Sequence, residues 1–346
     1  MFEHPEFEDH ERVVFACDRD SGLKAIIAVH STALGPAFGG CRMWPYADEA
    51  QALADVLRLS RGMTHKAAIC SLPYGGGKAV IIGDPRDKTP ALLRAMARAV
   101  EELRGRYIIA DDIGTTLEDL AVMREVTRHT AAATAGAQQP LAVTAYGVLM
   151  AIGAAVEHRL GAAGLAGLRV AVPGLGNVGF PLCGYLQDEG AELVVTDLDP
   201  VRVARAESAF GAATVGPEAI YEQAADVFAP CALGGVLNDD TIPRLRATIV
   251  CGGANNQLAL GRHDAALAAR GILYVPDYVA NAGGVIDFHQ ERVDDRPEAV
   301  LRAVRRIREI TADLLARAAA TGRTPLEIAD ALVAERLAAG RGMCTP

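Results

Sequence analysis

The sequence predicts an α/β protein of two domains: an N-terminal α/β domain and a second domain built on a doubly wound parallel sheet. The chain has 346 residues with 51% hydrophobic content, more than one hydrophobic core usually organises. Short apolar runs alternate with helical stretches in its second half, as in a parallel sheet covered on both faces. Between the two patterns lies a stretch of small residues without periodicity, Ala131 to Pro140. We therefore expect domains at residues 1–140 and 141–323, with a C-terminal helix at about 324–346 that returns to the first.

The first domain begins with two β-rich runs, Arg12 to Ala16 and Leu23 to Val29. The next segment, Leu34 to Arg42, is rich in glycine and predicts a loop. A further strand is expected at Tyr107 to Ala110. Helical patterning between these runs gives the domain its α/β character.

Three helices of this domain have recognisable start signals. Asp48 is suited to cap a helix, and Thr89 followed by Pro90 offers an N-cap with proline at the first helical position. Thr115 and Glu118 have the spacing of a capping box, in which each side chain bonds the other residue's backbone N–H. We expect helices to begin at these three points.

The second domain contains five short apolar runs separated by turns or helical stretches. They are LRVAVPG, AELVVTD, ADVFAP, ATIVCGG and ILYVPD. Runs this short and apolar predict strands that are buried on both faces. Two helices follow between Pro297 and Gly340, the second opened by Thr324-Pro325 with Glu327 completing a capping box.

Composition excludes several classes of protein. The formal net charge of -9 leaves no positive excess for phosphate backbones, so we expect no nucleic-acid partner. The seven cysteines are widely spaced without a Cys-x-x-Cys pair, which predicts reduced thiols and no metal site. The acidic N-terminus lacks a secretion signal, and no apolar run approaches the length that spans a bilayer. We therefore expect a cytoplasmic protein without a membrane partner.

A glycine-rich run follows the first strand of the second domain and opens a helix, which makes a Gly-x-Gly-x-x-Gly match credible as a dinucleotide site. The first glycine permits a tight turn, the second lets the backbone approach the pyrophosphate, and the third allows close strand–helix packing. The helix N-terminus holds the pyrophosphate. The run is Gly174, Leu175, Gly176, Asn177, Val178 and Gly179.

An acid at the end of the next strand bears on which dinucleotide fits. Asp197 stands at the spacing at which a carboxylate accepts hydrogen bonds from the adenosine ribose. It would repel a 2′-phosphate, so the sequence favours NAD, while nearby Arg202 keeps NADP as an alternative. In a purely structural interpretation the glycines form only a tight turn and Asp197 is a solvated loop acid.

Two lysines bracket the most unusual stretch of the first domain. Lys66 follows His65, and Lys78 stands between the glycines Gly75 to Gly77 and the apolar run AVII. We expect the glycines to expose backbone beside Lys78, so that a substrate can approach closely. A lysine in apolar surroundings near a second cation is suited to proton transfer. The alternative is a surface lysine whose stem lies along the strand.

Two acids, Asp111 and Asp112, follow the strand at Tyr107 to Ala110, where the sites of α/β proteins tend to gather. The alternative for one or both is helix capping, because Thr115 starts a helix and acids favour helix N-termini.

Several longer motifs together resemble the glutamate/leucine/phenylalanine/valine dehydrogenase family, most closely its leucine and valine branch. The resemblance runs from about Arg12 to Ala334. It implies a first domain that carries the catalytic groups, a Rossmann-type second domain that binds NAD, and a cleft between them that closes on substrate. The motifs are LGPAFGGCRMWPY, RGMTHKAAICSLPYGGGKAVI, YIIADDIGTT, VTAYGV, GLGNVG, FAPCALGGVLND, GGANNQLA and PDYVANAGGVID.

The resemblance implies oxidation of an L-amino acid to its 2-oxo acid and ammonia. Lys66 matches the lysine that binds the substrate carboxylate, Lys78 the lysine that activates water to hydrolyse the imino acid, and Asp112 the aspartate that exchanges a proton with the amine. The other matching positions are Gly39, Gly40 and Asn281 at the substrate, and Thr144, Cys231, Ala232 and Asn256 at the cofactor.

Specificity is where the chain departs from the family pattern. Phe38, Ala110, Val285 and Phe288 match positions that line the side-chain pocket. Glutamate enzymes of the family have a lysine and a serine in place of the two phenylalanines, so glutamate should be rejected because its charge would be buried without a partner. We prefer a small branched aliphatic substrate; an aromatic substrate stacked on the two rings is the alternative. Phe288 could instead turn into the core and leave the pocket unchanged.

Two other functions remain open. One is a catalytically silent relative that only binds NAD or an amino acid, and the other is a different Rossmann oxidoreductase such as a 2-hydroxy-acid dehydrogenase. Lys66, Lys78 and Asp112 together argue against the first. Members of the family form dimers to octamers, so the resemblance implies a homo-oligomer.

Overall fold

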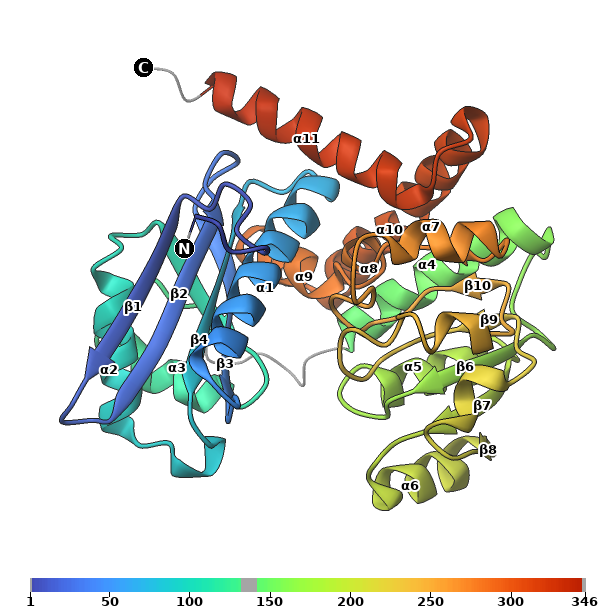
Figure 1. The fold of residues 1–346 in the computed structure, drawn as a ribbon, viewed down its shortest axis with the longest axis horizontal. Coiled ribbons are helices and arrows are strands. Elements are labelled where there is room, and N and C mark those ends of the chain that lie inside the picture. Colours follow the sequence, from blue (N-terminus) through green and yellow to red (C-terminus); the bar gives the residue numbers. More distant parts are fainter. Residues whose placement is uncertain (1, 132–141, 344–346) are drawn as a thin grey trace. The chain divides into compact units, whose positions relative to one another are not determined.

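The computed structural model describes residues 2–131 and 142–343, and the chain divides into two compact units, each with its own sheet (Figure 1). The first unit consists of Met1–Gln138 and Val333–Pro346, and the second of Gln139–Leu332. The sequence predicts the return to the first domain near residue 324, whereas this division falls after Leu332. The stretch expected to separate the domains lies, beyond Ala131, outside the described residues.

The first unit is built on a five-stranded mixed sheet with the order β1-β2-β4-β3-β5. β1 and β4 pair antiparallel with β2, and β3 pairs parallel with β4 and β5. The strands are β1 (Arg12–Asp18), β2 (Leu23–Ser31), β3 (Ala37–Trp44), β4 (Gly75–Ile82) and β5 (Tyr107–Asp111).

Strand β3 corrects the expectation of a loop at Leu34 to Arg42, because the strand already begins at Ala37. Its glycines are required where a neighbouring strand approaches closely. A Cβ on Gly39 would lie 1.8 Å from the carbonyl oxygen of Gly77. Glycine that serves close packing inside a sheet has the same sequence signature as glycine in a loop.

Helices cover both faces of this sheet (Figure 1). One face packs against α1 (Glu49–Ile69), and the other against α2 (Pro90–Glu101) and α3 (Leu117–Arg124), while the short 3-10 helix η1 (Pro85–Asp87) precedes α2. The predicted caps Asp48 and Thr89 are confirmed, since each side chain accepts a hydrogen bond from the first turn of its helix.

The third predicted cap is wrong by one residue. α3 is capped by Thr116, which forms a capping box with Asp119 rather than the expected pair of Thr115 and Glu118. The hydroxyl of Thr115 instead donates to the carbonyl oxygen of Cys41 at 2.7 Å. Thr115 therefore ties the loop after β5 to β3 and is not available as a cap.

The second unit contains a six-stranded sheet in which all pairs are parallel. Its order is β11-β10-β9-β6-β7-β8, so the chain builds outward from β6 in both directions, which is the doubly wound Rossmann topology. Five strands were predicted from their apolar runs; β8 was not, because it is two exposed residues long. The strands are β6 (Arg169–Pro173), β7 (Glu192–Thr196), β8 (Ala213–Thr214), β9 (Val227–Phe228), β10 (Ile249–Val250) and β11 (Leu273–Tyr274).

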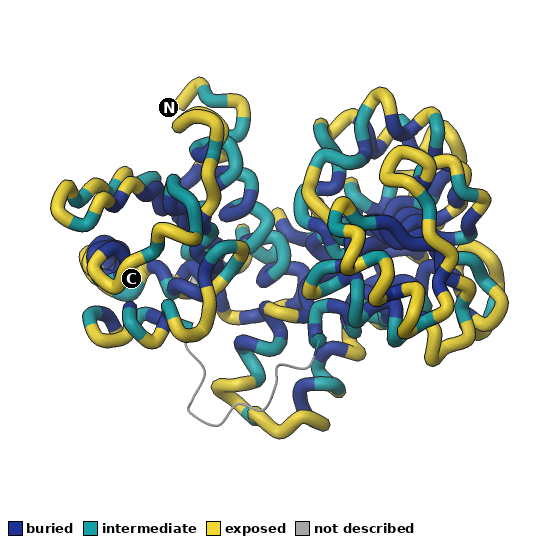
Figure 2. The backbone as a smooth tube through the Cα atoms, turned by 90° about the horizontal axis from the view of Figure 1, so that it is seen from below, coloured by how far each residue is buried: buried dark blue, intermediate teal, exposed yellow. Residues whose placement is uncertain are grey.

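Helices alternate with these strands, and the interior they enclose is buried in each unit (Figure 2). The predicted cap of the last helix is confirmed: Thr324 and Glu327 exchange side-chain and backbone hydrogen bonds at 2.9 and 3.2 Å. The helices are α4 (Val143–Leu160), α5 (Gly179–Asp188), α6 (Pro200–Phe210), η2 (Ala219–Glu222), η3 (Ile242–Arg244), α7 (His263–Ala269), α8 (Asp277–Ala280), α9 (Gly283–Val293), α10 (Pro297–Thr321) and α11 (Pro325–Met343).

No helix within the described ranges is both long and apolar enough to cross a bilayer.

Candidate active site

Strand alternation places several predicted site residues on one face of the first unit's sheet. Val80 of β4 packs with Ala28 of β2 on the face covered by α1, and Lys78 pairs in register with Ala28. Lys78 and Val80 are two residues apart and therefore share that face. On β3, Gly40 pairs in register with Ala110 of β5.

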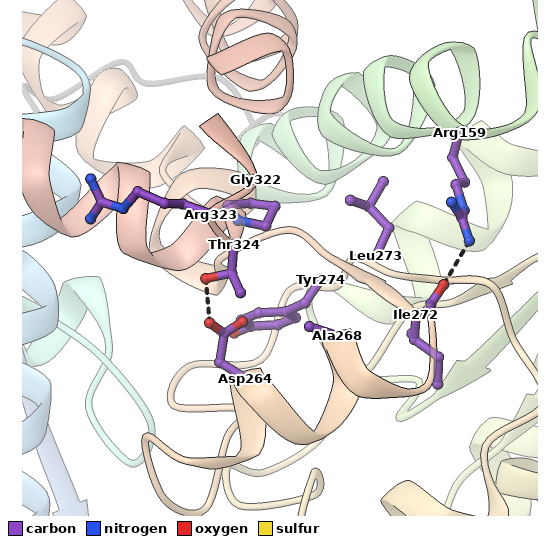
Figure 3. A pocket seen from close by; sticks show the side chains of 11 residues that line it. Arg159, Asp264, Ala268, Ile272, Leu273, Tyr274, Gly322, Arg323 and Thr324 are labelled. Carbon is purple, nitrogen blue, oxygen red and sulfur yellow. Dashed lines mark hydrogen bonds between the residues drawn. The ribbon is translucent and has the colours of Figure 1, made fainter. Parts of the chain in front are cut away.

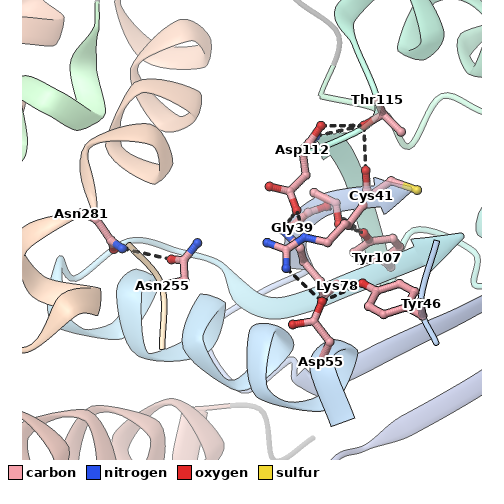
Figure 4. A network of polar contacts seen from close by, with 12 residues as sticks. Gly39, Cys41, Tyr46, Asp55, Lys78, Tyr107, Asp112, Thr115, Asn255 and Asn281 are labelled. Carbon is pink, nitrogen blue, oxygen red and sulfur yellow. Dashed lines mark hydrogen bonds and ion pairs between the residues drawn. The ribbon is translucent and has the colours of Figure 1, made fainter. Parts of the chain in front are cut away.

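The centre of the site is an ion pair between Lys78 and Asp112 (Figure 4). The ammonium nitrogen of Lys78 lies 2.9 Å from Oδ2 of Asp112, and Lys78 is only 5% exposed. Gly40 makes this approach possible. A Cβ at residue 40 would lie 3.1 Å from the Lys78 nitrogen and 2.8 Å from the Cβ of Asp112. The structure therefore rejects the alternative of an exposed surface lysine at position 78.

A second cation holds the same carboxylate. Nε of Arg42 donates to Oδ2 of Asp112 at 3.1 Å. Burial acts to raise the pKa of Asp112, but the charges of Lys78 and Arg42 outweigh it and hold that pKa well below its usual range. Without substrate, Asp112 is therefore a carboxylate at physiological pH and free to accept a proton.

The loop after β5 fixes the backbone of Asp112. The hydroxyl of Thr115 lies 3.0 Å from the backbone nitrogen of Asp112, and the backbone N–H of Thr115 donates to the carbonyl oxygen of Asp112. Gly114 has φ of 81°, and a Cβ there would lie 2.1 Å from the carbonyl oxygen of Met43. Since α3 is capped by Thr116, capping does not account for Asp112.

The glycines before Lys78 do not expose backbone as expected. Gly75, Gly76 and Gly77 are buried within β4. A Cβ on Gly76 would lie 2.0 Å from the backbone nitrogen of Thr64 on α1, and one on Gly77 would lie 2.7 Å from the ring of Tyr107. These glycines let a helix and a ring pack directly on the strand that carries Lys78, so the expectation of open backbone beside Lys78 is wrong. Lys66 is half-buried in the last turn of α1.

The glycine-rich run of the second unit has the geometry of a phosphate-binding turn. Gly174 has φ of 99°, and a Cβ there would lie 2.6 Å from the backbone nitrogen of Ala232. A Cβ on Gly179 would lie 1.8 Å from the carbonyl oxygen of Gly174 and 3.0 Å from the Cβ of Cys231. Next to Gly176, in contrast, the nearest described atom is 3.7 Å away, on Arg202. The backbone at Gly176 is therefore the part of the turn that a ligand can reach.

Asp197 lies beside this turn, at the end of β7. Its Oδ2 accepts a hydrogen bond from the backbone N–H of Leu175 at 2.7 Å, and its Oδ1 accepts one from Asp199 at 2.9 Å. Arg202 approaches both acids, at 3.8 Å from Asp197 and 3.6 Å from Asp199. The acid is therefore a structured part of the turn, and the interpretation of Asp197 as a solvated loop acid is wrong.

The side chain of Asn281, in the second unit, is hydrogen-bonded through its nitrogen but not through its oxygen among the described residues. Its side-chain nitrogen donates to the carbonyl oxygen of Gly253 at 3.2 Å and to Oδ1 of Asn255 at 3.0 Å (Figure 4). Its Oδ1 is buried without a hydrogen-bond partner among the described residues. Asn256 has φ of 52°, a strained conformation of the kind that clusters at functional sites.

The remaining predicted residues of the second unit gather at the start of α9. A Cβ on Gly284 would lie 3.3 Å from the hydroxyl oxygen of Thr144 on α4. Val285 and Phe288 follow on α9 and are 4% and 5% exposed. The guanidinium of Arg292 lies over the ring of Phe288, 3.6 Å from its centroid. In the first unit, the ring of Phe38 lies 6.2 Å from that of Tyr74.

A separate pocket of about 230 Å³ lies at the start of β11 (Figure 3). It is at the amino ends of the parallel strands, whereas Gly174 follows the carboxyl end of β6, so it is remote from the glycine-rich turn. Its polar groups pair with one another or with backbone: Thr324 donates to Asp264, and Arg159 donates to the carbonyl oxygen of Gly271. Among residues 2–131 and 142–343, no cluster of His, Cys, Asp or Glu could hold a metal ion.

A doubly wound sheet with a dinucleotide-type turn, together with a separate α/β unit that carries a buried lysine–aspartate pair, is typical of a dehydrogenase. Residues 10–129 match the family described as "Glu/Leu/Phe/Val dehydrogenase, dimerisation domain", and residues 197–338 match "Glutamate/Leucine/Phenylalanine/Valine dehydrogenase". The chain belongs to the Glu/Leu/Phe/Val dehydrogenase family, as its motifs predicted.

Individual relatives span nearly the whole chain. The leucine dehydrogenase of Thermoactinomyces intermedius is 48% identical over 88% of this chain and 84% of its own length. The crystal structure of L-tryptophan dehydrogenase from Nostoc punctiforme superimposes with a TM-score of 0.78 at 42% identity, covering 96% of this chain and 97% of that one. The hetero-hexameric glutamate dehydrogenase of Thermus thermophilus has a TM-score of 0.82 at 26% identity, covering 97% and 90%. The predicted two-domain α/β fold is confirmed.

Sequence reasoning missed the groups that hold Asp112 in place. Arg42, Asp55, Tyr46 and Thr115 were not proposed as parts of the site. The one available signal was strand alternation, which places Arg42 two residues after Gly40 and on the same face. That signal could not be used because the segment was interpreted as a loop.

Proposed function

We propose that this protein catalyses the reversible, NAD-dependent oxidative deamination of a branched-chain aliphatic L-amino acid to its 2-oxo acid, ammonia and NADH. The observation that carries the proposal is the buried ion pair of Lys78 and Asp112, 2.9 Å apart. The 48% identity to a leucine dehydrogenase supports the substrate class. An NAD- or amino-acid-binding protein without catalysis has no need for a buried pair of proton-transfer groups.

In the proposed reaction, Lys66 binds the substrate, and Asp112 and Lys78 transfer protons. Lys66 binds the carboxylate of the amino acid, and Asp112 accepts a proton from its ammonium group so that the amine is neutral. Bound NAD supplies the acceptor for the hydride that leaves the α-carbon. Lys78 then removes a proton from the water that attacks the resulting imino acid. Asp112 returns its proton to the nitrogen of the tetrahedral adduct, and ammonia leaves as the hydroxyl of the adduct gives its proton to the same carboxylate, which yields the 2-oxo acid. In the reverse direction the same groups return these protons.

We assign Asn281 to substrate binding. Its Oδ1 lacks a hydrogen-bond donor among the described residues although it is buried, and a buried amide oxygen without a partner carries a substantial desolvation cost. A donor from the substrate, such as its amine, would remove that cost.

The residues of the second unit fit NAD. The accessible backbone at Gly176 and the tight turns at Gly174 and Gly179 form the cradle that a pyrophosphate needs. The carboxylate of Asp197 is placed to accept hydrogen bonds from the ribose hydroxyls and to repel a 2′-phosphate. Arg202 is already engaged by two acids, which supports NAD over NADP.

The side-chain pocket decides which amino acids the site accepts. We assign Phe38, Ala110, Val285 and Phe288 to its lining, and all four are less than a tenth exposed. A glutamate side chain placed against such groups would lose its hydration without gaining a counter-charge, so we expect it to be rejected. The likeness to L-tryptophan dehydrogenase supports the second candidate, an aromatic substrate.

We also propose that the protein is a cytoplasmic homo-oligomer. The family description of residues 10–129 as a dimerisation domain and the hexameric assembly of a structural relative support self-association. Sedimentation or light scattering would measure the number of subunits in solution. A monomer at micromolar concentration would contradict the proposal.

The test is NAD reduction at alkaline pH across a panel of valine, leucine, isoleucine, 2-aminobutyrate, phenylalanine, tryptophan and glutamate. We expect turnover of branched aliphatic substrates, none of glutamate, and loss of turnover in Lys78→Ala. Activity confined to phenylalanine and tryptophan would select the aromatic candidate. NAD binding without turnover of any substrate would contradict the proposed function.

A further inference from the structure

Arg42 joins the carboxylate of the candidate site to a second, non-catalytic carboxylate. Its Nε donates to Oδ2 of Asp112 at 3.1 Å, and its Nη1 donates to Oδ2 of Asp55 at 2.9 Å (Figure 4). The side chain of Arg42 is 14% exposed. The three residues come from three elements: β3, α1 and the loop after β5.

Asp55 is itself held in place. The hydroxyl of Tyr46 donates to Oδ2 of Asp55 at 2.6 Å, and Asp55 lies within α1, which packs on the same face of the sheet. Tyr46 and Asp55 therefore brace one arm of the guanidinium while the other arm reaches Asp112. A guanidinium presents these donors in a fixed plane, whereas the ammonium of a lysine is a single point on a flexible stem.

Arg42 and Lys78 both contact the same oxygen of Asp112, Oδ2. The other oxygen, Oδ1, is left outside the two ion pairs. A lysine can lose its proton during a reaction, but an arginine keeps its charge at every accessible pH. Of the two cations on Asp112, only Arg42 therefore remains charged when Lys78 acts as a base.

We infer that Arg42, braced by Asp55 and Tyr46, is a positioning residue that fixes the orientation of Asp112 and keeps one positive charge on its carboxylate throughout the reaction. The inference rests on the proposed function, because it assigns Arg42 to the proton transfer of Asp112 and Lys78. Arg42 acts through Asp112: in this role it takes no proton and binds no substrate. Its effect is on the direction of the carboxylate and on the number of protons that the pair holds.

The positive charge of Arg42 should affect the pH at which the Lys78–Asp112 pair loses a proton, and this pH can be measured. Arg42 repels a proton on the Lys78–Asp112 pair, so removing its charge makes the pair retain that proton to higher pH. Burial keeps Cys41, Tyr46 and Tyr107 neutral by raising the pKa of each side chain. Among the described residues, the charged and titratable groups around the pair include Lys78 on β4, Arg42 and Cys41 on β3, Asp111 and Tyr107 on β5, Asp55 on α1, Tyr46 after β3, Glu118 and Asp119 on α3, and Lys88 before α2.

The experiment compares the pH dependence of kcat in wild type, Arg42→Met, Arg42→Lys and Asp55→Asn with an amino acid that the wild type turns over. We expect Arg42→Met to lower kcat by about 100-fold, the cost of a misplaced reacting group, and to move the alkaline rise of activity up by about one pH unit. Arg42→Lys should return the alkaline rise of activity to its wild-type pH while kcat stays reduced. A lysine restores the positive charge but lacks the planar set of guanidinium donors that contacts both Asp55 and Asp112. Asp55→Asn should lower kcat without moving the alkaline rise to higher pH, because Arg42 remains charged.

Several outcomes would overturn the inference. An Arg42→Met enzyme whose pH profile coincides with that of the wild type would show that the charge does not act on the proton-transfer pair. Wild-type kcat in Asp55→Asn would show that the brace has no role. If Arg42→Met does not fold, as judged by its thermal transition and its affinity for NAD, Arg42→Lys and Asp55→Asn alone decide: both must lower kcat without weakening NAD binding. Failure of the wild type to turn over any amino acid would refute the proposed function instead, and would do so before any variant is measured.

Discussion

Replacing Gly40 with alanine tests whether the close approach of Lys78 and Asp112 is what makes the site work. The added Cβ would lie 2.6 Å from the carbonyl oxygen of Asp111, 2.8 Å from the Cβ of Asp112 and 3.1 Å from the nitrogen of Lys78. Relief of these contacts to an ordinary 3.4 Å or more requires movements of several tenths of an ångström in backbone and side chain. Displacements of about 1 Å in a reacting group can lower rates by about 100-fold.

The assay is the initial rate of NADH formation with a saturating branched-chain amino acid, together with thermal unfolding. We expect Gly40→Ala to lower kcat by about 10- to 100-fold and to leave the affinity for NAD unchanged, because the glycine-rich turn belongs to the other unit. A Gly40→Ala enzyme that keeps most of the wild-type kcat would refute the reasoning.

Gly62 provides a matched control. It lies inside α1, where an added Cβ meets no described atom within 4 Å. Alanine in the interior of a helix is favoured over glycine by about 0.5–1 kcal/mol. Gly62→Ala should therefore raise the melting temperature slightly and leave kcat unchanged, which separates a local effect at position 40 from a general effect of glycine replacement.

Three further predictions concern other parts of the molecule. Asp197→Asn should raise the Kd for NAD by about 10-fold or more and bring NADP within reach, as measured by calorimetry with both dinucleotides, because a neutral side chain no longer repels a 2′-phosphate; an unchanged preference for NAD would contradict the assignment. Gly77→Ala should destabilise the first unit by about 1–3 kcal/mol in denaturant unfolding, because its Cβ would lie 2.7 Å from the ring of Tyr107; wild-type stability would show that the ring moves freely. Burial lowers the pKa of His30 from 6.5 to about 3 and of His65 to about 4. The unfolded chain therefore binds more protons below pH 6.5, and stability should fall as the pH drops below that value, by up to about 1.4 kcal/mol per histidine per pH unit; unfolding curves that are unchanged between pH 7 and 5 would contradict this.

Much of the second unit follows from its sequence because local signals are sufficient there. Short apolar runs that are buried on both faces identify five of its strands, and the spacing of glycines and Asp197 identifies the turn. Strand β8 carries no such signal, since its two residues are exposed; it joins the sheet by pairing with β7. The cap of α3 was displaced by one residue because two adjacent threonines both fit the pattern, and the contact of Thr115 with Cys41 decides between them.

The site of the first unit depends on contacts between distant segments, which local sequence patterns do not predict. Lys78 and Asp112 were proposed from their neighbours and from the family resemblance. Gly39 and Gly40 were interpreted as part of a loop and Gly75 to Gly77 as open backbone, whereas these glycines allow close packing between segments far apart in the chain. The contacts of Arg42 with Asp55 and Asp112 likewise join distant segments, so no local pattern of residues predicts them.

The most direct test of the account is the oxidation of NADH by the wild-type enzyme with a branched-chain 2-oxo acid such as 4-methyl-2-oxopentanoate, measured with and without ammonium. If Lys78 and Asp112 interconvert an imino acid and a 2-oxo acid, NADH oxidation requires both the oxo acid and ammonium and stops when either is omitted. Oxidation of NADH by the oxo acid alone would instead identify a 2-hydroxy-acid dehydrogenase and contradict the central claim.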